Sequence, residues 1–124
     1  MTPQILLGLA GFLSALWLVF HLVQGGKEVV RPLRASTGLD PAVRDTLYMC
    51  WHFVTATLAV MFASFVLAIA TSRQDLAIVG TSIAFGFTLT GIGQVPAMRA
   101  RYRDLPQGWL FLPITILGSA GLML

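Results

Sequence analysis

The two histidines of the chain both occur in apolar stretches and are the first candidates for chemistry. His21 follows Trp17 by four residues and His52 follows Tyr48 by four, so each imidazole is expected one helical turn from an aromatic ring. Polar side chains inside a membrane are costly and usually face the bundle interior, a cavity or a partner. If their two helices are antiparallel neighbours, both rings lie at a similar depth and could share one pocket.

Helical spacing adds further polar side chains to the two histidine faces. Gln24 and Glu28 continue the face that carries His21, and Asp45 precedes Tyr48 by three residues. A third apolar segment adds one amide at the same end of the predicted bundle. The sequence therefore predicts a ligand-binding or cofactor-binding pocket built from six residues: His21, Glu28, Asp45, Tyr48, His52 and Gln94.

This set of residues is compatible with several kinds of chemistry, and the sequence leaves them open. His21 and His52 could hold a single metal ion, with Glu28 or Asp45 completing its coordination, because imidazole and carboxylate suit zinc, iron or manganese. The same two imidazoles could be the axial ligands of a haem b. They could also recognise an organic ligand such as a quinone head group, sense pH, or simply anchor the helix ends through hydrogen bonds.

The elements that would hold these residues are four apolar segments. Of the 124 residues, 56% are apolar and 10% are charged, which would leave too much apolar surface exposed in water. A bilayer span takes about 20 apolar residues, so four spans use about 80 and leave no room for a separate soluble domain. We predict a single all-α domain, an up-down four-helix transmembrane bundle of a polytopic membrane protein, with spans at about 4–24, 46–71, 76–98 and 107–124.

Local signals mark the helix boundaries and the packing faces. Asp40 followed by Pro41 predicts the start of the second helix, because the carboxylate accepts from free N–H groups and proline needs no donor there. The first helix is expected to end before Gly25, with a loop over about 25–39. Small residues in every span permit close packing, either within one monomer or against a partner subunit: Gly8, Gly11, Ala15, Ala56, Ala59, Ala63, Gly80, Gly86, Gly91, Gly93, Gly118 and Gly121.

The cations are distributed very unevenly between the connections. Seven of the eight flank the first and third connections, and such an excess indicates the cytoplasmic side. Both termini are therefore expected on the non-cytoplasmic side of a bacterial inner membrane, with no nucleic-acid partner, because topology explains the charge. Five arginines are expected to contact anionic lipid head groups or, alternatively, to grip a phosphate between the loops: Arg31, Arg34, Arg99, Arg101 and Arg103.

No complete catalytic constellation is visible, and HExxH, CxxC and phosphate-loop patterns do not occur. The leading interpretation is a small integral membrane binding or accessory subunit with a polar pocket near the cytoplasmic face, surrounded by lipid, in a homo-oligomer or a larger membrane complex. One alternative is a metal-dependent or haem-dependent membrane enzyme acting on a lipid-soluble substrate. Another is a small oligomeric channel or carrier, which the lack of carboxylate, lysine or arginine at mid-membrane disfavours.

Overall fold

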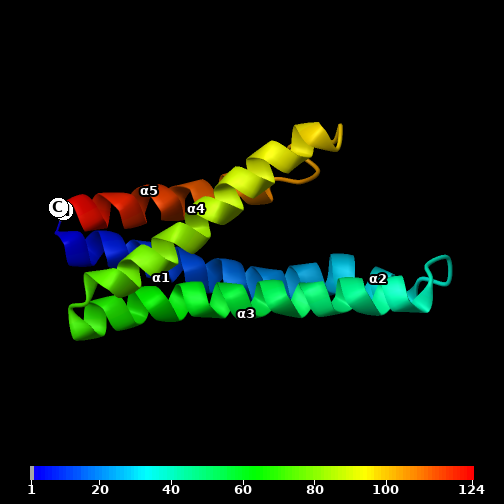
Figure 1. Cartoon of the computed structure of the whole chain (residues 1–124), viewed down its shortest axis with the longest axis horizontal. Helices are drawn as coiled ribbons and strands as arrows, with labels where there is room; N and C mark the ends of the chain where they lie inside the picture. The colour runs from blue at the N-terminus through cyan, green and yellow to red at the C-terminus, as the bar shows by residue number, and fades with distance from the viewer. Residues whose placement is uncertain (1) are drawn as a thin grey trace.

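The computed structural model describes residues 2–124, and in this range the chain is a four-helix up-down bundle without strands (Figure 1), which confirms the predicted fold class. The first long helix is made of three continuous pieces, and the other three helices are separate. The elements in chain order are α1 (Pro3–Phe20), the π-helix η1 (His21–Val30), α2 (Arg31–Ala35), α3 (Pro41–Thr71), α4 (Gln74–Ala97) and α5 (Gln107–Met123).

Three of the four helices are long and apolar enough to cross a membrane, and the fourth, α5, is apolar but shorter. At 1.5 Å per residue, the 31 residues of α3 extend about 46 Å and the 17 residues of α5 about 25 Å. The hydrocarbon core of a bilayer is about 30 Å thick, so the pair formed by the first long helix and α3 must extend beyond it. Figure 1 shows this pair reaching further than α4 and α5 at one end.

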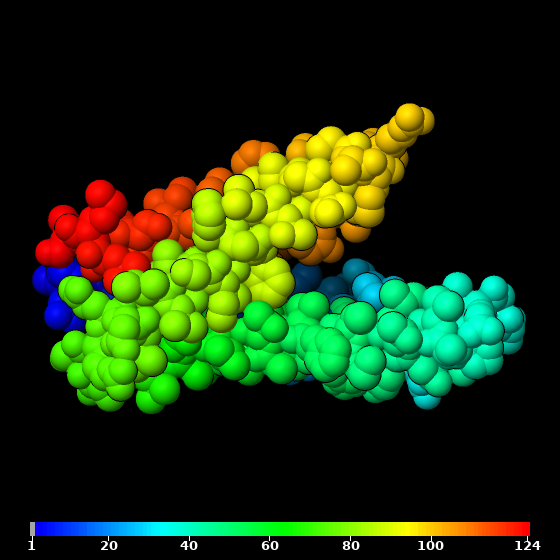
Figure 2. All heavy atoms as spheres, viewed as in Figure 1, coloured from blue at the N-terminus to red at the C-terminus, as the bar shows by residue number. Residues whose placement is uncertain are grey.

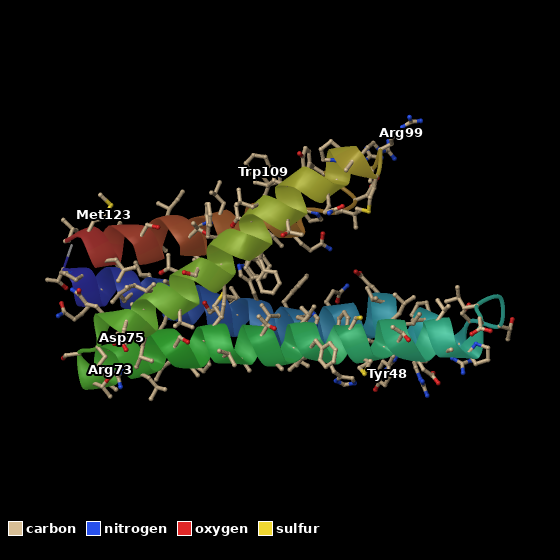
Figure 3. The ribbon with its side chains drawn as sticks, viewed as in Figure 1. Tyr48, Arg73, Asp75, Arg99, Trp109 and Met123 are labelled. Carbon is tan, nitrogen blue, oxygen red and sulfur yellow. The ribbon has the colours of Figure 1, made fainter. Side chains whose placement is uncertain are left out.

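The two ends of the bundle differ strongly in charge. Both termini lie at the end that carries Arg73 and Asp75, which form an ion pair (Figures 1 and 3). Arg99 lies at the opposite end, and α2 is also at that end (Figures 1 and 3). The other seven of the eight cations belong to η1, α2, the start of α3 and the loop between α4 and α5, at the end opposite the termini.

The sequence predicts that the first helix ends before Gly25, and this prediction is wrong. It continues as η1 and α2 to Ala35, and the non-helical connection shrinks to 36–40. Proline inside an α-helix clashes with the carbonyl four residues earlier, and Pro32 lies directly after the π-helical segment. In that segment the chain follows wider i to i+5 turns, such as the bond from Arg31 N–H to the Gly26 carbonyl. The wide turns provide a physical reason why the helix passes this proline.

The start of α3 is confirmed at the predicted residue. The Asp40 carboxylate accepts a hydrogen bond from Ala42 N–H at 2.8 Å, and Pro41 is the first helical residue. The helix ends at Thr71, where Ser72 adopts a left-handed conformation with φ of 55°. Capping and proline placement therefore define this boundary in the way that the sequence indicated.

Glycines bring the helices together at the end that carries the termini. Phe65 of α3 is fully buried, and a Cβ on either Gly11 of α1 or Gly80 of α4 would press on its side chain. Gly121 of α5 lies against Leu7 of α1 in the same way. Around the bundle, α1 packs on α3 and α5, and α4 packs on α3 and α5. At this end the helix backbones therefore lie close together, which only small residues at the contacts permit.

A second set of close contacts joins α4 to α5. A Cβ on Gly91 would overlap the backbone of Gly108, and Thr88 Oγ1 lies 3.1 Å from Thr115 Oγ1 across the same interface. Other predicted small residues face outward: Gly86 and Gly93 have no atom within 4 Å of an added Cβ. The alanines of α3 that share one face, Ala56, Ala59 and Ala63, are exposed.

The bundle opens toward the cation-rich end. We call α1, η1, α2 and α3 the long arm, and α4 with α5 the short arm. Figure 2 shows a wedge-shaped hollow between the two arms, which widens from the closed end toward the loop between α4 and α5. This hollow is where the candidate site lies.

The contact between Gly91 and Gly108 predicts a matched pair of variants in α4. Gly91→Ala should lower the free energy of unfolding by about 1–3 kcal/mol, because the added methyl group must push two backbones apart. Gly86→Ala adds the same group where nothing lies within 4 Å and should change stability by less than about 0.5 kcal/mol. Unfolding in mixed detergent micelles, followed by near-UV circular dichroism, measures both. Equal stabilities of the two variants would contradict the packing described above.

Candidate ligand-binding cavity

A cavity of about 450 Å³ lies between the two arms at the open end. Both arms contribute to its wall, which is mainly aromatic and aliphatic with polar groups at the outer part. From the long arm the lining residues are Trp17, Phe20, His21, Gly25, Glu28, Val29, Trp51, Val54 and Leu58. From the short arm and its loop they are Phe87, Arg103, Asp104, Pro106, Gln107, Leu110 and Phe111.

Aromatic rings close the deep part of the cavity. The indole N–H of Trp17 donates to the Leu110 carbonyl at 2.9 Å, so α1 is tied directly to α5. Phe87 and Phe111 lie against each other on the short arm, with ring centroids 4.9 Å apart and planes 32° apart. Below these rings the helices are joined by the closed glycine packing, so the cavity does not continue through the bundle.

The imidazole of His21 forms the wall next to α3. Its ring stacks on the indole of Trp51, with centroids 3.7 Å apart and planes 14° apart, and its Nε2 lies 2.9 Å from Thr55 Oγ1. Trp51 and Thr55 are four residues apart and therefore share one face of α3. Gly25 lets the indole lie there, because a Cβ at this position would overlap the ring of Trp51. The geometry of η1 thus places a histidine and a glycine against the same aromatic ring.

Charged side chains surround the outer part of the cavity, and each has a partner. The Glu28 carboxylate accepts a hydrogen bond from the Gln24 amide. Asp104 pairs with Arg101 at 3.1 Å and with Arg103 at 3.6 Å. All these side chains are largely exposed, so each pair contributes little to stability. Their effect is to make the mouth polar while the interior remains apolar.

A second polar cluster lies on the long arm, away from the cavity. Arg34 pairs with Asp45 at 3.0 Å and places its guanidinium 4.8 Å from the ring centre of Tyr48. The ring of His52 meets Tyr48 edge to face, with centroids 4.6 Å apart. None of these four residues lines the cavity. Figure 3 shows Tyr48 on the long arm, toward the end that carries α2.

The six residues predicted to form one pocket are thus distributed over different places. His21 and Glu28 line the cavity, whereas Asp45, Tyr48 and His52 belong to the second cluster. Gln94 is exposed on α4 and does not line the cavity. The reason is helical geometry: His52 directly follows Trp51, so the two side chains point about 100° apart around α3, and only Trp51 faces His21.

The metal and haem hypotheses gain no support from this arrangement. His21 directs Nε2 at Thr55 and has one ring face covered by Trp51, while His52 is exposed. Within residues 2–124, no group of three or more His, Cys, Asp or Glu side chains is placed to hold a metal ion. Both hypotheses stay predictions.

The five arginines predicted to bind anions are divided between the two arms. Arg31 and Arg34 are on α2, whereas Arg99 lies at the tip of the short arm, just before Arg101 and Arg103 (Figure 3). Three of them form ion pairs with aspartates of their own arm. In the part of the chain that the structure describes, Arg31 and Arg99 have no carboxylate within 4.0 Å. Contact with anionic lipid at these two positions stays a prediction.

Sequence reasoning missed most of the cavity wall. Trp51, Phe87 and Phe111 line the cavity but are not among the six residues of the predicted pocket. One signal in the sequence could have indicated Trp51. Trp51 and Thr55 are four residues apart and therefore share a face of α3, next to the face that carries Tyr48 and His52. The contributions of the short arm could not be found this way, because they depend on how far the two arms separate.

The contact between Gly25 and Trp51 predicts a second pair of variants. Gly25→Ala should displace the indole from His21 and reduce the near-UV circular dichroism of the tryptophans, because the new methyl group would occupy the place of the ring. Gly26→Ala is the control, since no atom lies within 4 Å of its added Cβ. An unchanged tryptophan signal in Gly25→Ala would show that the stacked arrangement does not exist in solution.

Comparison of the chain with protein-family models, with curated proteins and with solved structures gives no match. The cavity is therefore the feature that bears on function. Its defining features are an apolar aromatic interior, one histidine with an ordered hydrogen bond, and a polar mouth at the cation-rich end.

Proposed function

We propose that the protein is a small integral membrane binding protein that holds a lipid-soluble small molecule between its two arms. The observation that carries the proposal is the cavity of about 450 Å³, which is lined by residues of both arms. Small-molecule sites typically occupy 300–1,000 Å³ and combine an apolar wall with a few polar groups that fix orientation. His21 and the mouth residues are the polar groups in this case.

The position of the cavity along the helices suits an amphiphile. The apolar part of a span covers about 20 residues, and 20 residues counted back from Thr71 reach Trp51. The interior of the cavity, at Leu58 and Phe87, then lies within the hydrocarbon layer, and Glu28 and Arg103 lie at the level of the lipid head groups. A molecule with an apolar tail and a polar head would match both environments.

The proposal includes the location and context of the protein. We place the cation-rich end in the cytoplasm of a bacterial cell, with the protein in the inner membrane and both termini on the other side, because short loops rich in Lys and Arg remain cytoplasmic. A chain of this size that binds without a complete catalytic set would act as a binding or accessory subunit, in a homo-oligomer or a larger membrane complex.

Binding can be tested with methyl 11-bromoundecanoate, a single-chain ester whose bromine quenches nearby tryptophan fluorescence. Trp109 is exposed, so a Trp109→Phe protein reports only on Trp17 and Trp51, both of which line the cavity. In dodecyl maltoside micelles we expect saturable quenching. Val54→Phe should weaken the apparent affinity about fivefold or more, which is about 1 kcal/mol, because the added ring occupies the cavity.

Val60→Phe is the matched control for this experiment. Val60 is also an exposed valine of α3, but it does not line the cavity, so its variant should bind within about twofold of the parent protein. Quenching that rises linearly with the ester, without saturation, would indicate partition into the micelle and would refute the proposed binding function. Equal affinity of the two valine variants would place the ligand elsewhere.

Orientation is tested by labelling single cysteines. In a Cys50→Ser background, Ser72→Cys and Thr37→Cys place a thiol in the connections at the two opposite ends. In right-side-out vesicles an impermeant maleimide should label Ser72→Cys directly and Thr37→Cys only after permeabilisation, because the loop of Thr37 is flanked by cations. The reverse pattern would overturn the proposed orientation without affecting the cavity.

A further inference from the structure

The hydrogen bonds around His21 favour one position for the proton of its ring. Thr55 Oγ1 lies 3.1 Å from the Trp51 carbonyl and 2.9 Å from His21 Nε2. A hydroxyl has one proton, and a carbonyl can only accept, so both contacts are satisfied together when Thr55 donates to the Trp51 carbonyl. In that arrangement the oxygen of Thr55 accepts from His21, which puts the imidazole proton on Nε2.

The other nitrogen of the ring is consequently an acceptor. In a neutral imidazole with the proton on Nε2, Nδ1 has a free lone pair. Within residues 2–124, the one buried side-chain nitrogen or oxygen without a hydrogen-bond partner is Thr81 Oγ1. His21 is half-buried, and its Nδ1 has no partner in the same range, so Nδ1 remains accessible. Because His21 lines the cavity, this lone pair is available to a molecule inside it.

The surroundings of this acceptor favour a flat head group. One face of the imidazole is covered by Trp51, so a ligand must approach the ring at its edge. Phe87 and Phe111 supply aromatic surfaces on the opposite arm, and Trp17 supplies another at the deep end. Aromatic walls of this kind pack well against a planar ring. No cation of the long arm lines the cavity, so nothing on this wall would favour an anionic head.

We propose that the cavity selects an amphiphile whose head is a hydroxylated aromatic ring, of the phenol or quinol class, and that the ring O–H donates a hydrogen bond to His21 Nδ1. This inference rests on the proposed binding function and adds the class of ligand to it. A ligand head that offers only acceptors, such as an aryl ether or a quinone, leaves Nδ1 without a donor. Thr55 acts as a positioning residue, because it fixes the proton on Nε2.

Selectivity is tested with 4-nonylphenol and 4-nonylanisole, in which a methyl group replaces the donor proton of the phenol. Each is used to displace the brominated ester from the Trp109→Phe protein, with the affinities corrected for partition into micelles. The phenol should bind about 3- to 10-fold more tightly than the ether, as expected for one net hydrogen bond. His21→Phe keeps a ring that can stack on Trp51 but has no acceptor, so the preference should fall to about 1.

His52→Phe is the matched control and should keep the full preference, because His52 lies outside the cavity. Equal binding of phenol and ether to the parent protein, or a preference that survives in His21→Phe, would overturn the inference and leave the binding function standing. If neither compound displaces the ester, and the ester itself does not saturate, the binding function fails instead.

The proton position gives a second, independent readout that does not depend on ligand. In a His52→Phe protein purified without a histidine tag, His21 is the single histidine. Its ¹⁵N NMR spectrum should show a protonated Nε2 and an unprotonated Nδ1. Thr55→Val removes the acceptor of Nε2–H and should produce a mixture of the two tautomers and a smaller phenol preference. If the His52→Phe protein with Thr55 unchanged carries the proton on Nδ1, the proposal is overturned.

Discussion

The packing of Phe65 between two glycines is the contact on which the rest of the architecture depends. With Gly11 on one side and Gly80 on the other, α1 and α4 can both approach α3 at the closed end. Lipid supplies little hydrophobic drive for helix association, so close packing of this kind must hold the bundle together. Toward the cation-rich end the facing residues are large, as at Trp17 and Phe87, and the arms cannot approach as closely. The gradient from small to large side chains accounts for the wedge between the arms.

The π-helical segment connects this architecture to the site. An α-helix that continued unchanged toward Pro32 would meet the usual clash with the carbonyl four residues earlier. The wider turns of η1 begin at His21, and Gly25 in this segment lies against Trp51. π-Helical turns often occur at functional sites, and in this protein the segment supplies His21, Gly25 and Glu28 to the cavity wall. The helical irregularity and the candidate site are therefore one structural feature.

Much of the fold could be predicted from local signals, whereas the site could be predicted only in part. Asp40 and Pro41 define the start of α3 because capping acts over a few residues. The extension of the first helix beyond Gly25 was missed, since the contact of Gly25 with Trp51 joins two helices and no local spacing in the sequence shows it. The pairing of His21 with His52 rested on equal depth, but depth does not specify which face of a helix a residue occupies. Phe111 and the other short-arm residues depend on the separation of the arms, which no spacing in the sequence encodes.

Hydrogen-bond donors on the first long helix, made of α1, η1 and α2, explain why the open end keeps a defined shape without close packing. Hydroxyl groups within the helices, such as those of Ser14 and Thr57, donate to the carbonyl four residues earlier and so leave their oxygens as acceptors. A hydroxyl arranged in this way is well placed to accept from an N–H donor on another helix. Trp17 donates to α5 and His21, four residues later, is placed to donate to Thr55 of α3. Because an unpaired donor is costly in a membrane, these two bonds resist further separation of the first long helix from either neighbour. The cavity therefore has one firmly held wall, the first long helix, and its width is determined by the side chains that face it.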